Sequence, residues 1–444
     1  LKSERKLASC DNEGKLYQMK IRSLLLCLIL INAYANSAFA QDQVFQKLQT
    51  AQMQVLQTTD QIENERKQLY PWLARIFLNH RLAYRVDYAK DASSDKCRSD
   101  LWKAQQKENR TFQSITKSIQ NYLEQCHDEI IDGWDDPLSN TYKTMMGQIE
   151  FDPRKYEHGR FVLFHLQGGI QLKGFLALHD DQKKRPLIIF RLGIFSNTSE
   201  FYPERFLFRQ LFEQSDFNML ILESNSGQEF IHRNKKNLIG GYHEGLQNFE
   251  VAKIIQGSNQ PLSKLITHVH LLGMSFGGHG VLYASLLNDQ EQKKQKAKPI
   301  IASAIAMCPL INFRDTLDVH LSQGVISWFL ETWAGYRMKG IENDLSELKS
   351  SSHFLRSLVE NSKKEYWQSN DFWKQYQNIQ TPVLIFSTEK DPLVLFDLNS
   401  KRLQSGYMNI GQSNLKVFSF PRGYHCSFPG AYKWQPIKNL LEQY

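Results

Sequence analysis

One serine in this chain stands in a motif that could make it a nucleophile. Ser275 is the centre of a Gly-x-Ser-x-Gly pattern over residues 273–277. An apolar run typical of a buried strand comes before the motif, and a stretch typical of a helix follows it. A sharp turn between two such elements needs small residues two positions on either side of the serine, and it lifts the hydroxyl to the end of the strand. The pattern predicts a serine poised for nucleophilic attack, with the N–H of Phe276 directed into the same site.

The elements that would position this serine are short apolar runs, which alternate with helical stretches from about residue 155 onward. The predicted strands are 161–164, 172–178, 186–190, 217–222, 268–272, 300–308, 382–386 and 415–420. The predicted helices are 205–212, 242–255, 278–287 and 434–441. The first two strands read as a hairpin that turns at Gly168 and Gly169. The alternation predicts an α/β fold with a mostly parallel central sheet and helices on both faces.

The turn at Ser275 and the order of the strands resemble the α/β-hydrolase superfamily over about residues 155–444, and no subfamily is assigned. In that superfamily the acid and the histidine of the catalytic triad follow the serine in the sequence. The resemblance implies a serine hydrolase that needs no metal or organic cofactor. No metal-ligand spacing such as His-Glu-x-x-His occurs in the chain.

A serine hydroxyl needs a neighbouring base to take its proton at neutral pH. Four of the thirteen histidines follow the serine: His279, His320, His353 and His425. His425 comes just after the last predicted strand, and it is the one histidine C-terminal to the best acid. His279 lies inside the helix after the serine and is expected to face the sheet or solvent. We therefore predict that His425 is the base.

The best acid follows the strand at 382–386, in the sequence Ser-Thr-Glu-Lys-Asp-Pro. A buried carboxylate in this position would fix the tautomer of the imidazole and stabilise its cation. Asp391 fits the strand-end acid of the superfamily, and Glu389 is the alternative. The sequence therefore predicts a triad of Ser275, Asp391 and His425.

An oxyanion hole needs a second backbone N–H beside that of Phe276. The superfamily often has His-Gly-x after an earlier strand, and this chain has Leu192 in the place of the histidine while Gly193 is retained. By resemblance Ile194 would supply the second N–H. A shift of register would give that role to Gly193 or Phe195.

About seventy residues separate the strand that ends near Pro309 from the strand at 382–386, far more than one crossover needs. By resemblance the insertion, at about 312–378, is a helical cap over the serine. Its many aromatic residues would wall a pocket for an apolar acyl or aryl group. For any single aromatic residue, burial against the core is the simpler explanation.

Residues 19–40 have the three parts of a secretory signal. Met19 to Arg22 form a basic start, residues 24–31 an apolar core, and Ala38 to Ala40 a small-x-small cleavage site. The apolar core is shorter than the roughly 20 residues that a membrane span requires. We expect export, periplasmic or secreted, with a mature chain from Gln41 and with residues 1–18 as an upstream extension. A short membrane anchor is the alternative.

Residues 41–150 are predicted to be a helical region that precedes a catalytic domain over 151–444, because almost no glycine or proline interrupts them. Apolar side chains recur every three or four residues in two stretches. They are Val44, Leu48, Ala51, Val55, Thr58 and Ile62, and then Phe112, Ile115, Ile119, Tyr122 and Cys126. These helices either pack against the rest of the chain or bind a protein partner or a second copy.

Composition supports a globular protein with a substantial core. Of the 444 residues, 41% are hydrophobic and 12% aromatic, which excludes a disordered or collagen-like chain. The net charge of +8 is small for this length, and no zinc-finger or RNA-binding motif accompanies it, so we expect no nucleic-acid partner. The mature chain would keep Cys97, Cys126, Cys308 and Cys426 in a disulfide-permissive compartment, with their pairing open. A single helix over 99–126 would exclude a bond between the first two, whereas a break near Asn109 would leave that bond open.

The leading interpretation is an exported hydrolase that cleaves a carboxylic ester with an apolar portion through an acyl-enzyme on Ser275. An acyltransferase or a peptidase could use the same triad. The third interpretation is a binding or assembly protein whose function lies in the helical front region. The intact Ser275, Asp391 and His425 argue against it.

Overall fold

The computed structural model describes part of the chain. The described residues are 44–56, 111–125, 156, 158–181, 183–198, 208, 211–213, 215–296, 298–338, 344–345, 353–410, 414–420 and 425–426. The predicted signal, the upstream extension, the helix predicted over 434–441, Cys97 and Cys126 lie outside them. The chain divides into two compact units, Leu1–Gln49 and Thr50–Tyr444. The sheet and the candidate site belong to the second unit.

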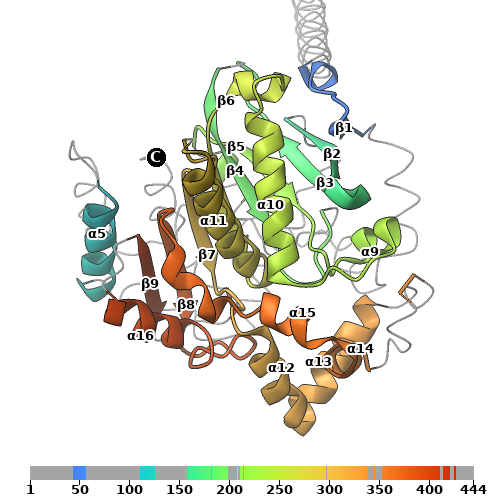
Figure 1. Ribbon diagram of the computed structural model, residues 1–444, viewed down its shortest axis with the longest axis vertical. Coiled ribbons are helices and arrows are strands. Elements are labelled where there is room, and N and C mark those ends of the chain that lie inside the picture. The colour runs from blue at the N-terminus through green and yellow to red at the C-terminus, as the bar shows by residue number, and fades with distance from the viewer. Residues whose placement is uncertain are drawn as a thin grey trace, which may run out of the picture. The chain divides into compact units, whose positions relative to one another are not determined.

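A nine-stranded sheet runs through the described part of the second unit, in the order β1-β2-β3-β5-β4-β6-β7-β8-β9 (Figure 1). The strands are β1 (Met53–Val55), β2 (Gly159–Leu166), β3 (Ile170–Ala177), β4 (Arg185–Arg191), β5 (Asn218–Leu222), β6 (Ile266–Met274), β7 (Ser303–Met307), β8 (Val383–Thr388) and β9 (Leu415–Phe420). From β5 through β9 all neighbours are parallel, whereas β1, β2 and β3 pair antiparallel. The predicted mostly parallel α/β sheet is confirmed.

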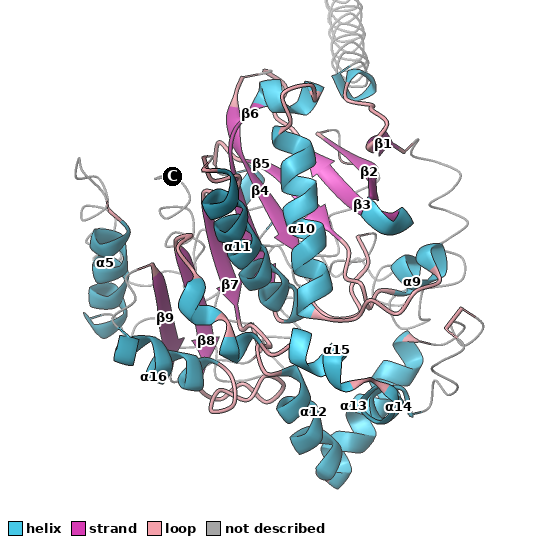
Figure 2. Cartoon of the chain, viewed as in Figure 1, coloured by secondary structure: helices cyan, strands magenta, loops and turns pink. Residues whose placement is uncertain are grey.

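Helices cover both faces of this sheet, which explains why its central strands are apolar runs. Every residue of β5, β7 and β8 is buried. Helices α10 (Gly241–Gln256) and α11 (Phe276–Gln295) pack against each other and against the sheet (Figure 2). Alternate strand residues, among them Ile188 and Phe190, form a separate core cluster with α5 (Phe112–Gln125). Since successive side chains of a strand point to opposite faces, the two sets of helices lie on opposite sides.

The predicted hairpin is formed by β2 and β3. Its turn, η1 (Gln167–Gly169), holds Gly168 at φ 70° and Gly169 at φ 73°. Both angles lie in the left-handed region that side chains with a Cβ rarely adopt, so glycine suits both positions.

The helix predicted from the spacing of Val44, Leu48, Ala51 and Val55 is wrong. Of the described residues 44–56, only 44–47 are helical, and Met53–Val55 is strand β1, which pairs antiparallel with β2; Thr58 and Ile62 lie outside the described residues. The hydroxyl of Thr50 accepts the N–H groups of Gln52 and Met53 and turns the chain before the strand. Periodicity failed here because the partner strand lies more than a hundred residues further along the chain.

The second predicted front helix is confirmed as α5. Phe112, Ile115 and Ile119 form its buried face, and they belong to the core cluster. Thr111 and Ser114 exchange side-chain to backbone hydrogen bonds at the start of the helix. The helix therefore begins at Phe112, and residues 99–110 of the single helix considered over 99–126 lie outside the described residues. The apolar face of α5 packs within this unit.

The segment between β7 and β8 is helical, as predicted, and we call residues 312–378 the inserted segment. It contains α12 (Phe313–Ser322), α13 (Gly324–Arg337), α14 (Phe354–Asn361), α15 (Lys364–Ser369), η4 (Phe372–Lys374) and η5 (Tyr376–Asn378). In Figure 1 it lies beyond the carboxyl ends of the parallel strands. The other described helices are α9 (Gln228–Asn234), η2 (Pro261–Leu265) and α16 (Ser400–Ile410). None of the helices described is long and apolar enough to cross a bilayer.

Candidate active site

Ser275 occupies a strained turn between β6 and α11. Its backbone has φ 54° and ψ −116°, a conformation that residues with a Cβ rarely adopt. Backbone strain of this kind is common at functional sites. The Ser275 N–H donates to the Met307 carbonyl at 2.8 Å, and the Ser275 carbonyl accepts the N–H of Leu310 at 3.2 Å. The end of β7 therefore holds the serine backbone from the side of the neighbouring strand.

The two glycines of the motif are required by close backbone contacts. A Cβ on Gly273 would lie 2.2 Å from the Gly277 carbonyl oxygen, and a Cβ on Gly277 would lie 2.3 Å from the Arg191 carbonyl oxygen. The second contact brings the start of α11 against the end of β4. Phe276 is the first residue of α11, where an N–H has no carbonyl four residues back within the helix. The predicted first oxyanion donor thus lies beside the loop that follows β4.

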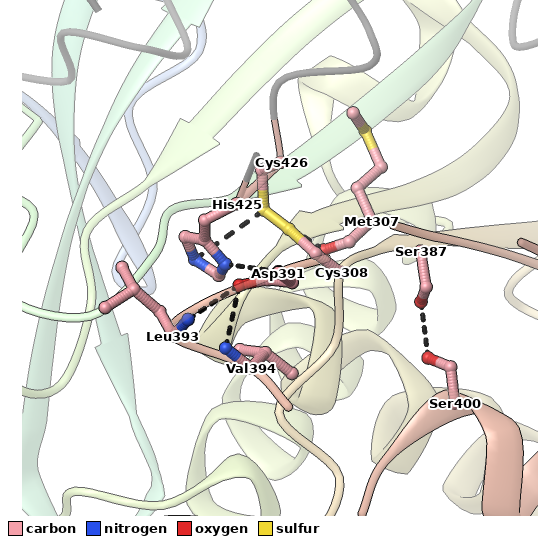
Figure 3. The surroundings of a disulfide bond; sticks show 9 residues. All are labelled: Met307, Cys308, Ser387, Asp391, Leu393, Val394, Ser400, His425 and Cys426. Atoms are coloured by element: carbon pink, nitrogen blue, oxygen red, sulfur yellow. Dashed lines mark hydrogen bonds and ion pairs between the residues drawn. A yellow bond between two sulfur atoms is a disulfide. The ribbon is translucent and has the colours of Figure 1, made fainter. Parts of the chain in front are cut away.

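Asp391 and His425 meet as the sequence predicts (Figure 3). The Nδ1 of His425 lies 2.8 Å from Oδ2 of Asp391. The other carboxylate oxygen of Asp391 accepts the N–H groups of Leu393 and Val394, both at 2.8 Å. Asp391 is buried, so three hydrogen bonds fix its side chain away from solvent. Glu389, the alternative acid, is exposed.

Ser275 follows the carboxyl end of β6, Asp391 follows that of β8, and His425 comes after β9. No described residue hydrogen-bonds the Ser275 hydroxyl. The Nε2 of His425 lies 3.8 Å from Sγ of Cys426, the next residue in the chain. Hydrogen bonds of a catalytic site often tighten only when substrate binds. The structure therefore joins the acid to the histidine, and the described residues offer the hydroxyl no hydrogen bond.

The three other histidines after the serine do not hydrogen-bond Asp391. His279 is buried against Tyr283 and Phe372, and burial lowers its pKa to about 3. His320 lies in α12 and its Nε2 bonds the Leu393 carbonyl at 2.8 Å, next to the acid. His353 is exposed just before α14. His425 is the one of the four that contacts a strand-end carboxylate.

The loop after β4 forms a turn in which Ser196 donates to the Gly193 carbonyl at 3.2 Å. Phe195 has φ 61°, and its N–H donates to the Ser226 hydroxyl at 2.7 Å. Because this bond occupies the Phe195 N–H, the geometry favours Ile194 over Phe195 as the second oxyanion donor. We call residues 193–196 the oxyanion turn.

Beneath the oxyanion turn lies a buried polar network that the sequence did not suggest. Arg191 is fully buried at the end of β4 and donates to Asn225 at 2.8 Å and to Gln247 at 2.9 Å. Its Nε lies 3.4 Å from a carboxylate oxygen of Glu244. The other oxygen of Glu244 accepts the Ser224 hydroxyl and the Asn225 N–H. Burial lowers the pKa of Arg191 and raises that of Glu244, while their mutual attraction opposes both shifts.

This network fixes the segment that holds the oxyanion turn. Ser224 donates its N–H to the Ser196 carbonyl at 3.0 Å, and its hydroxyl lies 2.8 Å from that of Ser226. One signal could have pointed to this segment, because residues 223–227 are polar and follow the carboxyl end of a parallel strand, where α/β sites gather.

The inserted segment contacts both ends of the site. Arg337 of α13 donates to the Phe195 carbonyl of the oxyanion turn. The ring of Phe195 meets those of Trp333 and Phe354 at centroid distances of 5.0 and 6.0 Å. Phe313 of α12 packs edge-on against Phe276 at 5.1 Å. The aromatic residues of the insertion thus contact Phe276 and Phe195, the residue that follows Ile194.

A disulfide joins Cys308, at the end of β7, to Cys426, across 118 residues of sequence. Together with His425, these are the one group of potential metal ligands that converges among the residues the structure describes. A thiolate is the form of cysteine that binds a metal, and two sulfurs bonded to each other offer none. In the disulfide form the two cysteines of this cluster therefore form a covalent link next to His425 and are not metal ligands.

No protein-family model matches this chain, and no curated protein matches it in sequence. In a comparison of folds, an esterase of Pyrococcus furiosus is similar with a TM-score of 0.45 at 15% identity, over 64% of this chain and 91% of that chain. Acetyl xylan esterase 1 of a Thermoanaerobacterium species gives 0.43 at 14%, over 69% and 92%. Dipeptidyl peptidase 4 of Porphyromonas gingivalis gives 0.42 at 13%, over 64% of this chain but only 35% of that longer protein.

The order of the parallel strands and the turn at the end of β6 are those of an α/β-hydrolase fold, as the resemblance implies. No subfamily follows from the comparisons.

Proposed function

We propose that the protein is a serine hydrolase that cleaves carboxylic esters through an acyl-enzyme on Ser275. The observation that carries the proposal is the hydrogen bond of 2.8 Å between His425 and the buried carboxylate of Asp391, at the strand ends that also carry the strained serine. A buried carboxylate on Nδ1 leaves Nε2 as the basic nitrogen of a neutral imidazole.

In the first step, the Ser275 oxygen attacks the ester carbonyl while Nε2 of His425 takes the hydroxyl proton. The carbonyl oxygen becomes an anion, which the N–H groups of Phe276 and Ile194 stabilise. The C–O bond to the alcohol then breaks, and His425 returns the proton to the leaving oxygen. Asp391 stays ionised and orients the imidazole.

In the second step, water attacks the acyl-enzyme and His425 takes one of its protons. The new tetrahedral anion occupies the same oxyanion site, and it collapses to release the carboxylic acid as the proton returns to Ser275. Apart from the ester and water, every group that transfers a proton, forms a bond or stabilises the anion in this scheme is a side chain or backbone group of this chain.

The aromatic rings around the oxyanion turn support a substrate with an apolar portion. Trp333 is exposed and its ring reaches Phe195 from the inserted segment, so an acyl or aryl group bound near the oxyanion site would contact apolar surface.

Labelling with a fluorophosphonate probe tests the proposal. The native protein should react, and the Ser275→Ala variant should not. Equal labelling of both proteins, or none of the native protein, would contradict the serine-hydrolase mechanism. A series of nitrophenyl esters of increasing chain length would then measure the size of the acyl pocket.

The alternatives share the triad and differ in the acceptor or the bond cleaved. A peptidase would hydrolyse peptide amides, and an acyltransferase would release less acid when a competing alcohol is present. Activity confined to peptide amides would reject the ester proposal while keeping the triad.

We include export in the proposal, supported by the leader pattern of residues 19–40 and by a disulfide at Cys308 and Cys426, a bond that persists in oxidising compartments. Expression from Met19 in a bacterial host should place the protein outside the cytoplasm, with Gln41 as its first residue. N-terminal sequencing of the fractionated protein would reveal a retained leader or a cytoplasmic location, either of which contradicts export.

A further inference from the structure

The disulfide between Cys308 and Cys426 lies against the proposed base (Figure 3). Cys426 follows His425 directly in the chain, and its sulfur is 3.8 Å from Nε2, the nitrogen that would take the serine proton. The N–H of Cys308 donates to the carbonyl of Phe386 within β8, so the other end of the link is tied to the sheet.

The same link reaches the nucleophile through one strand end. Met307, the residue before Cys308, accepts the Ser275 N–H on its carbonyl oxygen at 2.8 Å. That carbonyl oxygen also lies 3.6 Å from Sγ of Cys426. The serine backbone is therefore connected to His425 by a short route. The route consists of the hydrogen bond from Ser275 to Met307, the Met307–Cys308 peptide bond, the disulfide and the peptide bond between Cys426 and His425.

His425 has few other fixed contacts. Within the described part of the chain, the side chains that contact its imidazole through polar atoms are Asp391 at Nδ1 and Cys426 of the disulfide at Nε2. Asp391 fixes the rotation of the ring through Nδ1, while the disulfide fixes the backbone beside it to β7. Because a proton transfer requires the two heavy atoms within about 3 Å, the position of the histidine backbone decides whether Nε2 reaches the hydroxyl.

We infer that the Cys308–Cys426 disulfide is a positioning element for His425, and that its reduction switches the proposed hydrolase off. The inference rests on the proposed function, because it assigns His425 the role of base. It also predicts an enzyme that is inactive while its thiols are reduced and that becomes active once the disulfide forms, as in an oxidising compartment.

The chemistry of the switch is thiol–disulfide exchange with a dithiol. The Cys308–Cys426 bond takes up two electrons and two protons and becomes two thiols, while the dithiol is oxidised to its own disulfide. Reduction breaks the covalent link to β7. It also places an S–H group beside Nε2, where it can donate a hydrogen bond to the lone pair that the base needs.

The test uses the full chain with the other cysteines, Cys10, Cys27, Cys97 and Cys126, replaced by serine, so that one pair alone can respond to a dithiol. Dithiothreitol should lower kcat on a nitrophenyl ester by roughly 10- to 100-fold, up to the lower end of the 10²- to 10⁴-fold that acid–base catalysis contributes, because the base is displaced and not removed. KM should change by less than about threefold, and oxidised glutathione should restore kcat. Mass analysis after alkylation verifies that two thiols have formed.

The decisive control is the same experiment in a His425→Ala background. If the disulfide acts through His425, the residual activity of this variant should be nearly insensitive to dithiothreitol. If reduction lowers the activity of the variant as much as that of the parent, the disulfide merely stabilises the fold and the inference is overturned. An unchanged kcat after complete reduction of the parent would overturn it as well.

Two alanine variants, C308A and C426A, provide a second route that needs no reductant. Each should lose kcat to a similar degree and should show no response to dithiothreitol. Full activity in both variants would contradict the inference. A failure of the proposed function is distinguishable, because the oxidised parent would then show no fluorophosphonate labelling at Ser275, whereas a failure of the switch alone leaves that labelling equal in the oxidised and reduced proteins.

Discussion

The nucleophile and the base of the proposed site are held in different ways. Ser275 is positioned by backbone: two glycines in close contact, a hydrogen bond to β7 and the start of α11. His425 is positioned by side chains: one carboxylate and one disulfide next to it. A residue positioned by backbone is displaced when a Cβ is added to one of the contacting glycines, and the fold loses stability at the same time. A residue held by side chains can lose its position while the sheet remains intact.

The largest expected effect is on the base side. Asp391→Asn should lower kcat by about 10⁴-fold, since an amide cannot hold the imidazole in the productive tautomer. The amide oxygen can still accept the N–H groups of Leu393 and Val394, so the melting temperature should stay close to that of the native protein. The matched control is Glu389→Gln, which should leave kcat within about twofold. A larger loss in the Glu389 variant would reassign the acid.

On the nucleophile side, Gly277→Ala should damage both activity and stability. The added Cβ would lie 2.3 Å from the Arg191 carbonyl oxygen, so the start of α11 or the end of β4 must shift. We expect a loss of about 1–3 kcal/mol in the free energy of unfolding and a fall of at least roughly 100-fold in kcat. Urea denaturation and ester hydrolysis measure the two effects.

The control for this variant is Gly324→Ala, since nothing lies within 4 Å of a Cβ at that position. Its free energy of unfolding should remain within about 0.5 kcal/mol of the native value. If Gly277→Ala kept full stability and activity, the backbone would be more adaptable than the contacts indicate, and the contrast between the two sides would fail.

A smaller effect is expected at the oxyanion turn. Ser226→Ala removes the acceptor of the Phe195 N–H, and the turn should lose part of its alignment. We expect a fall of about tenfold in kcat with little change in KM, less than the 10²- to 10³-fold that loss of an oxyanion donor itself costs. Ser322→Ala, at an exposed serine of α12, should leave both constants unchanged. An unchanged kcat in the Ser226 variant would show that the turn is held from the inserted segment.

The prediction with the least effect on catalysis concerns the pH dependence of stability, and it belongs to the nucleophile side. Burial lowers the pKa of His279 in α11 to about 3, whereas the unfolded chain binds a proton at this residue near pH 6.5. Its contribution to stability is therefore present above pH 6.5 and is lost as the pH falls from 6.5 toward 3. The slope is at most about 1.4 kcal/mol per pH unit.

His279→Leu should reduce this loss, measured as the change in melting temperature between pH 7 and 5. Burial raises the pKa of Glu223 and Glu244, which acts in the opposite direction, but both carboxyl groups titrate in either protein. The difference between the two proteins thus isolates His279. Parallel pH profiles would show that this histidine contributes nothing to acid sensitivity.

The parts of the fold that the sequence predicted are those with a local pattern. Strand β9 is found over the predicted residues, and the sharp turn at Ser275 could be predicted from the two glycines around the serine. Asp391 and His425 could be singled out because parallel strands bring their carboxyl ends to one edge, and each residue follows such a strand.

What could not be predicted depends on contacts between distant residues. Strand β1 forms because it can pair with the edge of β2, and the local sequence of Met53–Val55 does not indicate that this partner is available. Ser226 acts through a turn that belongs to another strand. The pairing of Cys308 with Cys426 depends on the sheet order, in which β8 alone separates β7 from β9.

The short strand β1 and the helix α5 have a consequence for how the protein can be cut. A fragment that began at residue 151, the predicted domain boundary, would lack both elements. It would leave the outer edge of β2 unpaired along Val162–Phe164 and would uncover the apolar core beneath Phe112, Ile115 and Ile119. Open strand edges and apolar patches of this kind recruit further chains. Such a truncation should therefore precipitate on expression, whereas one that begins at Thr50 retains the complete sheet.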